Sequence, residues 1–270
     1  MNIYRCTFSL GNKVYKHSRQ KKLGSLTLEE SSHFLYYHRS SSPDVDLVRN
    51  EFNAIYAPIN RLYQFTPPSK VPVIIYDSPQ LMKEALHWRS AAAPMGIYWL
   101  GYINILAPSA WISSSPAELE CVFRLLGPVA HEYTHYVIDH LTYGNYPRWL
   151  SEGLAQFTEQ LLAKSPPVSP RSLLNEDFYS LDDLENHFDL LPNQGLAYME
   201  ALFLGEILVE QLSFSHIRWL LHKLQGGSKF FKLLRNSRLN YPTLNLLLQN
   251  RLWEKRKILL QCSPHPAELS

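Results

Sequence analysis

Two segments near the middle of the chain, each with a proline near its start, constrain the fold more than any other part of the sequence. Pro128 must interrupt a helical stretch, because proline lacks an amide donor and its ring clashes with the preceding turn, so a new helix can begin there. A second helix is expected over residues 146–163, with Pro147 near its start. The short connection around Gly144 predicts that these two helices pack antiparallel.

The rest of the chain divides into a mixed part and a helical part. Apolar runs predict strands, and a serine followed by proline predicts the start of a helix after Ser42 and after Ser78. Helical periodicity dominates the later sequence. We therefore expect an α+β fold in which residues 1–33 are unassigned, residues 34–112 form a mixed α/β lobe and residues 113–270 form a helical lobe. The strands are expected at residues 33–38 and 70–77, and the later helices at 194–213, 215–225, 228–236 and 243–260.

Residues 91–112 carry no charge over a length that could span a membrane. Proline and glycine interrupt this segment at Pro94, Gly96, Gly101 and Pro108, and the apolar stretches between them are short and rich in aromatic residues. We therefore expect two buried strands joined by a turn, and no transmembrane helix.

Charge and cysteine content narrow the class of protein. Hydrophobic residues make up 46% and charged residues 19%, as in a globular chain, and a net charge of +2 is too small to indicate nucleic-acid binding. Basic clusters at residues 19–22 and 255–257 are expected on solvated faces. Three widely spaced cysteines indicate reduced thiols, with Cys121 packed inside. Residues 1–16 lack the apolar run of a signal peptide, so we expect a cytoplasmic protein.

The first helix of the antiparallel pair carries two histidines four residues apart, in the stretch HEYTH at residues 131–135. Residues at this spacing share one helical face, so His131 and His135 can each direct one ring nitrogen at the same metal ion. Glu132 then faces the side of the metal site, where it can take a proton from a water whose pKa zinc lowers to about 7. The spacing predicts a Zn²⁺ site with its own general base.

A catalytic zinc site also needs a third protein ligand and one open position. Glu152 follows His135 by 17 residues and would lie opposite the histidines in an antiparallel helix pair. Glu159 is a competing candidate further along the same helix. His140 lies one turn beyond the motif, where a helix-end role is expected. Asp139 or Asp183 are candidates for orienting a metal ligand, and the sequence does not choose between them.

The stretch HEYTH at 131–135, followed by WLSEGLA at 149–155, resembles the gluzincin zinc metallopeptidases, of the thermolysin and aminopeptidase N type. The likeness covers about residues 34–260. In these enzymes the two histidines and the later glutamate hold zinc, and the first glutamate is the base. The resemblance implies His131, His135 and Glu152 as ligands and Glu132 as the base, in a thermolysin-like zincin domain over residues 34–270 that acts on a peptide or protein substrate.

The segment LAYMEALFLGEILVEQL at residues 196–212 is similar to the one that carries the oxyanion tyrosine in the aminopeptidase N family. By that likeness Tyr198 would donate a hydrogen bond to the oxyanion; Tyr241 is an alternative donor, and Tyr198 could equally be a core aromatic residue. Two positions depart from the family. Its lysine after the tyrosine is Glu200 here, and the segment MGIYWLGYINIL has no acid to anchor a free amine, which argues against an aminopeptidase.

Two interpretations from other classes stay open. The protein could bind zinc without catalysis, as a regulatory or peptide-binding module, although the presence of Glu132 favours an enzyme. Alternatively, the histidines form a satisfied polar patch, and the helical half is an interaction surface. The sequence indicates neither the substrate's sequence nor the oligomeric state.

Overall fold

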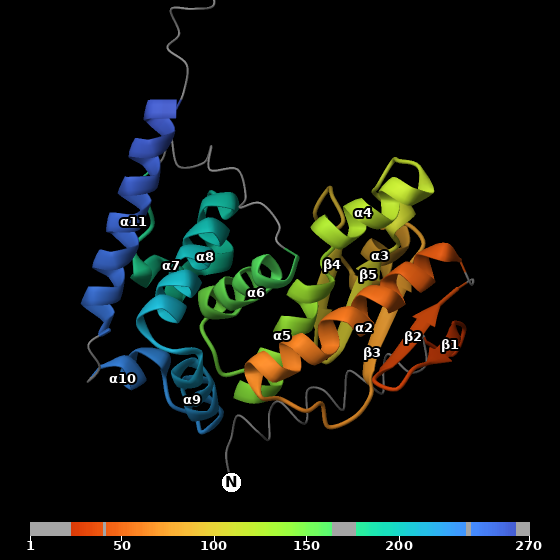
Figure 1. The fold of residues 1–270 in the computed structure, drawn as a ribbon, viewed down its shortest axis with the longest axis horizontal. Coiled ribbons are helices and arrows are strands. Elements are labelled where there is room, and N and C mark those ends of the chain that lie inside the picture. The colour runs from red at the N-terminus through yellow and green to blue at the C-terminus, as the bar shows by residue number, and fades with distance from the viewer. Residues whose placement is uncertain (1–22, 40–41, 164–176, 236–238, 263–270) are drawn as a thin grey trace, which may run out of the picture.

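The structure is a computed structural model, and it describes residues 23–39, 42–163, 177–235 and 239–262. A sheet with its covering helices lies on one side of the molecule, and an array of helices lies on the other (Figure 1). Both sides contribute to one hydrophobic cluster, which extends from Phe34 in the sheet to Leu252 in the last helix. The expected mixed α/β content is confirmed, and the two halves share the larger of two hydrophobic clusters.

The sheet has five strands in the order β1-β2-β3-β5-β4. Its central strands β2, β3 and β5 run parallel, whereas β1 and β4 pair antiparallel at the two edges. Every residue of β3 is buried, as expected for a strand covered on both faces. The strands are β1 (Thr27–Glu30), β2 (Phe34–His38), β3 (Val71–Tyr76), β4 (Gly96–Trp99) and β5 (Tyr102–Leu106).

Ten α-helices occur among the described residues, most of them at the predicted places. Pro58 lies inside α2, yet that helix continues to Tyr63. Short α7 falls outside the sequence predictions, as does β1. The helices are α2 (Pro43–Tyr63), α3 (Pro79–Leu86), α4 (Pro116–Leu126), α5 (Val129–Thr142), α6 (Arg148–Ala163), α7 (Leu181–His187), α8 (Gln194–Gln211), α9 (Phe214–Gln225), α10 (Phe230–Leu234) and α11 (Tyr241–Cys262).

Alternation along β3 assigns the two faces of the sheet. Val73 and Ile75 belong to the large cluster with Phe52 of α2, whereas Ile74 belongs to a smaller cluster with Met82 of α3. The two helices therefore cover opposite faces. Both begin with the predicted serine and proline, but only Ser78 accepts a hydrogen bond from its helix, and Ser42 makes no side-chain cap bond.

The uncharged segment 91–112 contains β4 and β5, so the prediction of two strands is confirmed, but the expected burial holds only for β5. The hairpin turns at Leu100 and Gly101, which both have positive φ, 46° and 86°. Every residue of β5 is buried, whereas β4 is partly exposed because it is the edge strand. No helix in the described ranges has the length and apolar character needed to cross a membrane.

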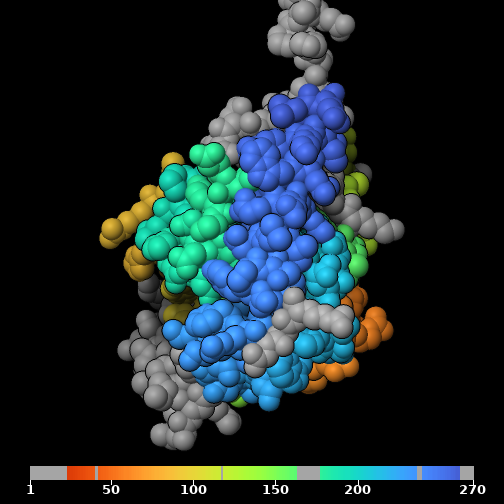
Figure 2. Space-filling view, turned by 90° about the vertical axis from the view of Figure 1, so that its left-hand side faces the viewer, coloured from red at the N-terminus to blue at the C-terminus, as the bar shows by residue number. Residues whose placement is uncertain are grey.

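The helical half is built outward from α5, which contacts the sheet, α2 and α6. Next, α6 packs on α8, and α11 forms a ridge along the outer side of this array (Figure 2). On α4 the buried residue is Phe123, and Cys121 is exposed, so the expectation that this thiol is packed inside is wrong. Lys255 and Lys257 on α11 are exposed as expected, whereas the basic cluster at 19–22 lies outside the described residues.

Candidate metal centre and cleft

The helix that carries the predicted zinc motif is buried on nearly all sides. Gly127 ends α4 and Pro128 caps α5, so the predicted break separates the two helices. Glu132, His135 and Asp139 are buried with only 7%, 6% and 7% of their surface exposed. Buried polar side chains need partners, and on this helix those partners come from β4 and α6.

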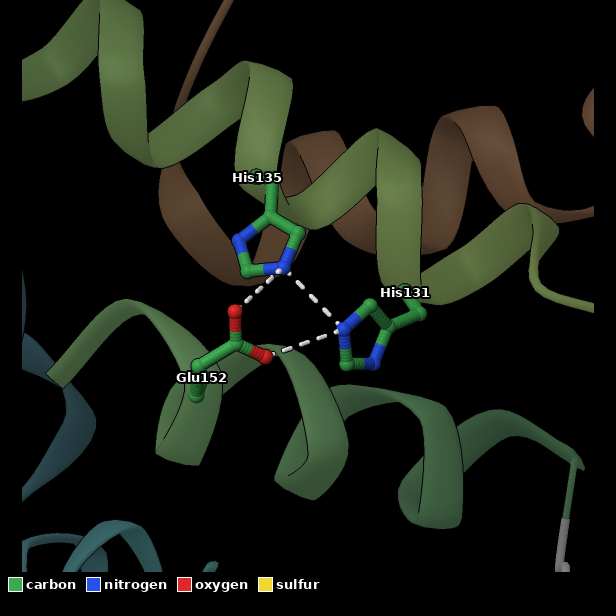
Figure 3. Close-up of side chains that lie close together, drawn as sticks. All are labelled: His131, His135 and Glu152. Carbon is green, nitrogen blue, oxygen red and sulfur yellow. Dashed lines mark hydrogen bonds and ion pairs between the residues drawn. The ribbon is translucent and has the colours of Figure 1, made fainter. Parts of the chain in front are cut away.

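Three side chains from α5 and α6 converge on one point (Figure 3). The Nε2 atoms of His131 and His135 lie 3.0 Å apart, and the carboxylate oxygens of Glu152 lie 3.3 Å from the first and 3.5 Å from the second. All three donor atoms fall within 4.8 Å of one another, a grouping that can hold a metal ion. The structure thus brings together the three residues that the sequence nominated as ligands.

The far side of each imidazole is also held in place. His135 Nδ1 lies 2.7 Å from the hydroxyl of Ser151, and His131 Nδ1 lies 3.1 Å from the carboxylate of Glu159. Partners of this kind orient both rings so that each Nε2 faces Glu152. Glu159, the competing candidate for third ligand, therefore lies behind His131 and not at the point of convergence.

The charges of the cluster fit a divalent cation. Burial alone would raise the pKa of Glu152, but the two imidazoles lower that pKa well below its usual value. Burial opposes protonation of His131, yet Glu152 and Glu159 raise the pKa of His131 well above its usual value. The Oε2 atom of Glu152 is buried and lies 3.3 Å from Nε2 of His131, and beyond this ion pair it has no hydrogen-bond partner among the described residues. A carboxylate held ionised beside two imidazole nitrogens is a donor set that suits zinc.

Glu132 lies beside this cluster and faces the edge strand. Its carboxylate accepts a hydrogen bond of 2.5 Å from the backbone amide of Tyr98 in β4. Burial raises the pKa of Glu132, while His131 and His135 lower it by less. A Cβ on Gly96 would lie 2.9 Å from a side-chain carbon of Glu132, so glycine permits the close approach of β4 to α5.

A cleft of about 350 Å³ opens above the cluster, between the β4 hairpin, α5, α6 and α8. Tyr198 lines it, and burial raises the pKa of this phenol to about 12 although its hydrogen bond with Arg148 lowers it. Tyr241 lines a different cavity with Asp182 and Glu185. The cleft is lined by Trp88, Pro94, Gly96, Ile97, Tyr98, Trp99, Leu100, His131, Glu132, His135, Asp139, Tyr146, Arg148, Glu152 and Tyr198.

Both aspartates that the sequence suggested as orienting groups have partners other than the histidines of the cluster. Asp139 accepts hydrogen bonds from the hydroxyls of Tyr98, at 2.5 Å, and Tyr146, at 3.3 Å. Burial raises the pKa of Asp139 to about 6. Asp183 instead caps α7 by pairing with Ser180. The outer nitrogens of the two rings contact Ser151 and Glu159 instead, and the sequence spacing alone does not distinguish such a partner from a third ligand.

Three other residues have local roles. His140 contacts the backbone oxygen of Tyr136 at 2.9 Å, one turn back on α5, as expected of a helix-end residue. The amide of Gln156 donates to the backbone oxygens of Glu152 and Tyr198, which ties α6 to α8. Trp149 is fully buried and donates to Glu185, so it anchors the start of α6.

Comparison with known proteins identifies the family. The family described as the peptidase MA superfamily matches residues 58–237, which are 180 of the 270 residues. The matched range includes α5, α6 and α8, and with them the cluster of His131, His135 and Glu152, as well as Glu132 and Tyr198. No curated protein matches the chain. The chain belongs to the peptidase MA superfamily.

Proposed function

We propose that the protein is a zinc-dependent peptidase of the gluzincin type, in which Glu132 is the general base. The observation that carries this proposal is the convergence of His131, His135 and Glu152, with donor atoms within 4.8 Å of one another, beside the carboxylate of Glu132. Membership of the superfamily supports a peptidase in general. The likeness to thermolysin and the aminopeptidase N family is part of the proposal.

Zn²⁺ is the proposed cofactor, and His131, His135 and Glu152 would hold it. When bound, zinc supplies a Lewis acid that activates water and polarises the carbonyl of the scissile peptide. Ser151 and Glu159 orient the two imidazoles from behind, as partners of zinc ligands do in other proteins.

The remaining steps fall to side chains around the cleft. Glu132 takes the proton of the attacking water and passes it to the leaving amine. Tyr198 lines the cleft from the α8 side, and its hydroxyl donates to the oxygen on which negative charge develops. A phenol whose pKa is raised to about 12 stays protonated at neutral pH and keeps the proton it needs for this role.

The edge strand β4 is the proposed binding site for the peptide backbone. The amide of Tyr98 is directed at Glu132 and not at β5, so this side of β4 is open for pairing with an extended peptide. A substrate that pairs with β4 would compete for that amide. Release of the amide would leave the carboxylate of Glu132 available to the attacking water.

Replacement of Glu132 by glutamine tests the proposed base. The Glu132→Gln protein should retain zinc but lose hydrolysis by a factor of about 10²–10⁴, because the amide cannot accept the proton. Cleavage of a mixed peptide library is read by mass spectrometry, and zinc is measured in the same preparation. Glu120→Gln, on the exposed side of α4, is the matched control and should cleave as the wild type does.

Three results would count against the proposal. Equal cleavage by Glu132→Gln and wild type would remove Glu132 as the base. A wild-type protein with near-stoichiometric zinc and no cleavage would favour the zinc-binding module. A purified protein that does not bind added zinc would contradict both the zinc peptidase and the zinc-binding module.

A further inference from the structure

One arginine, Arg148, lines the cleft, and it lies beside the cluster of His131, His135 and Glu152. Besides the tyrosines, the ionisable residues of the cleft are the acids Glu132, Asp139 and Glu152, the two histidines, and Arg148. Arg148 is the first residue of α6, and its side chain is 42% exposed, whereas that of Glu152 is 1% exposed. A guanidinium is thus presented to whatever enters a cleft that is otherwise acidic.

The guanidinium is anchored on its inner side. Its Nη2 atom lies 2.8 Å from Oε1 of Glu152, one helical turn further along α6, and Tyr198 of α8 forms a hydrogen bond with it. Both partners belong to walls of the cleft, so the position of Arg148 is fixed relative to the proposed zinc ligands. Five N–H donors in a rigid plane leave this side chain with capacity beyond its inner partners.

An acidic side chain already occupies the outer side. Asp189 lies with Oδ1 at 3.4 Å from Nε of Arg148, and its side chain is 70% exposed. The distance exceeds that of a good hydrogen bond, and an exposed ion pair contributes little free energy. The chain therefore places a weakly held carboxylate where the guanidinium meets solvent.

We propose that Arg148 is a specificity-determining residue that binds a carboxylate of the substrate. This inference rests on the proposed peptidase function and names its substrate class: peptides with an acidic group within one or two residues of the scissile bond. The closeness follows from Glu152, whose Oε1 contacts Arg148 at 2.8 Å and lies 3.5 Å from His135. The carboxylate of such a peptide displaces Asp189 and pairs with the guanidinium, a geometry that arginine favours.

Two sources could supply this carboxylate, and the experiment separates them. One arm compares blocked peptides that carry Asp or Glu at each position around the bond with the same peptides carrying Asn or Gln. The other arm compares peptides that end in a free carboxylate with their C-terminal amides. Binding of labelled peptides to the zinc-loaded Glu132→Gln protein is measured by fluorescence anisotropy, and cleavage by the wild type is measured in parallel.

The acidic member of at least one pair should bind about 10- to 100-fold more tightly than its amide, as charge-assisted hydrogen bonds allow. Arg148→Gln should reduce this ratio to near one, while Arg148→Lys should retain part of it. Each ratio compares two peptides on the same protein. A loss of zinc affinity in that protein therefore weakens binding of both peptides and cancels in the ratio. Arg61→Gln, on the exposed side of α2, is the control for loss of one positive charge and should keep the ratio.

Asp189→Asn tests the same proposal with a residue that is neither a proposed zinc ligand nor the proposed base. Removal of the competing carboxylate should increase the preference for acidic peptides by about 2- to 5-fold, the size of an exposed ion pair. Equal binding of acidic and amide peptides by the wild type would overturn the proposal, and so would an unchanged ratio in Arg148→Gln. If neutral peptides are still cleaved, the proposed function stands without this specificity; if no peptide is cleaved, the proposed function fails by itself.

Discussion

Two buried glutamates on neighbouring helices show how surroundings set the role of a carboxyl group. Glu152 on α6 and Glu200 on α8 are only 1% and 0% exposed. Glu152 faces two imidazoles and the guanidinium of Arg148. Glu200 accepts one hydrogen bond from the backbone amide of Tyr179, and its Oε2 has no partner within the part of the chain that is described.

The two carboxyl groups differ accordingly in charge. The pKa of Glu152 is held well below its usual value, because the imidazoles outweigh burial. Burial raises the pKa of Glu200 to about 8. Glu200 is therefore largely neutral at pH 7. Burial alone does not mark a functional acid; the buried acid that stays ionised is the one suited to a metal ion.

Replacement of Glu152 by glutamine removes the ionised carboxylate of this pair and should have the largest effect. The substitution keeps the shape of the side chain but removes an anionic zinc ligand. Zinc affinity should fall by more than about 100-fold, because loss of a ligand's partner alone costs about 10- to 100-fold. Peptide cleavage should be lost with it. Competition with a fluorescent chelator measures the affinity.

Glu200→Gln is the matched control for this experiment, since it makes the same substitution at the other buried glutamate. Its zinc affinity should equal that of the wild type. Wild-type zinc affinity in Glu152→Gln would show that Glu152 is not a ligand, even though its carboxylate faces both histidines.

The same Glu200→Gln protein tests whether the pKa of Glu200 is raised, through the pH dependence of stability. A carboxyl group whose pKa is about 8 in the folded protein and 4.5 in the unfolded chain binds its proton more tightly in the folded protein. Its contribution to stability is complete below pH 4.5 and is lost as the pH rises through 8. The loss amounts to up to about 5 kcal/mol. Glutamine does not ionise, so the free energy of unfolding of the variant should exceed that of the wild type increasingly from pH 5 to pH 9.

Urea unfolding of both proteins at each pH measures this difference, and subtraction removes the contribution of every other titrating group. A constant difference across the range would mean that Glu200 is already ionised in the folded protein. It would then need a cationic partner, and the contrast with Glu152 would disappear.

The contrast between local and distant contacts also explains how much the sequence could predict. The helix pair follows from signals within a few residues, namely Pro128, Pro147 and the spacing of His131 and His135. Glu152 could be nominated because an antiparallel pair brings it back to the motif. The structure places these residues together, and Tyr198 lines the same cleft.

Contacts between distant segments lay beyond the sequence. Glu159 is 28 residues from His131, and nothing in the spacing distinguished an orienting group from a third ligand. The pairing of Arg148 with Asp189 depends on a short turn after α7. Strand β1 was missed because three of its four residues are exposed and show no apolar alternation. Helix α7 spans only seven residues, too few for periodicity to show.

The contact between α6 and α8 holds both glutamates in place, and Gly153→Ala tests it. A Cβ at Gly153 would lie 2.2 Å from the backbone oxygen of Ala201, and one at Gly205 would lie 2.6 Å from the backbone oxygen of Gly153. Backbone atoms cannot rotate away, so the helices must separate. Overpacking of this kind costs about 1–3 kcal/mol of unfolding free energy.

Gly195→Ala, at the start of α8, is the matched glycine control, because its Cβ would meet no atom closer than 3.4 Å. It should leave stability unchanged or raise it by up to about 1 kcal/mol, since alanine favours helix. Urea unfolding measures both variants. A Gly153→Ala protein as stable as Gly195→Ala would show that α6 and α8 tolerate a wider spacing. The positions of Glu152 and Glu200 would then depend on their own partners, and not on the helix contact between them.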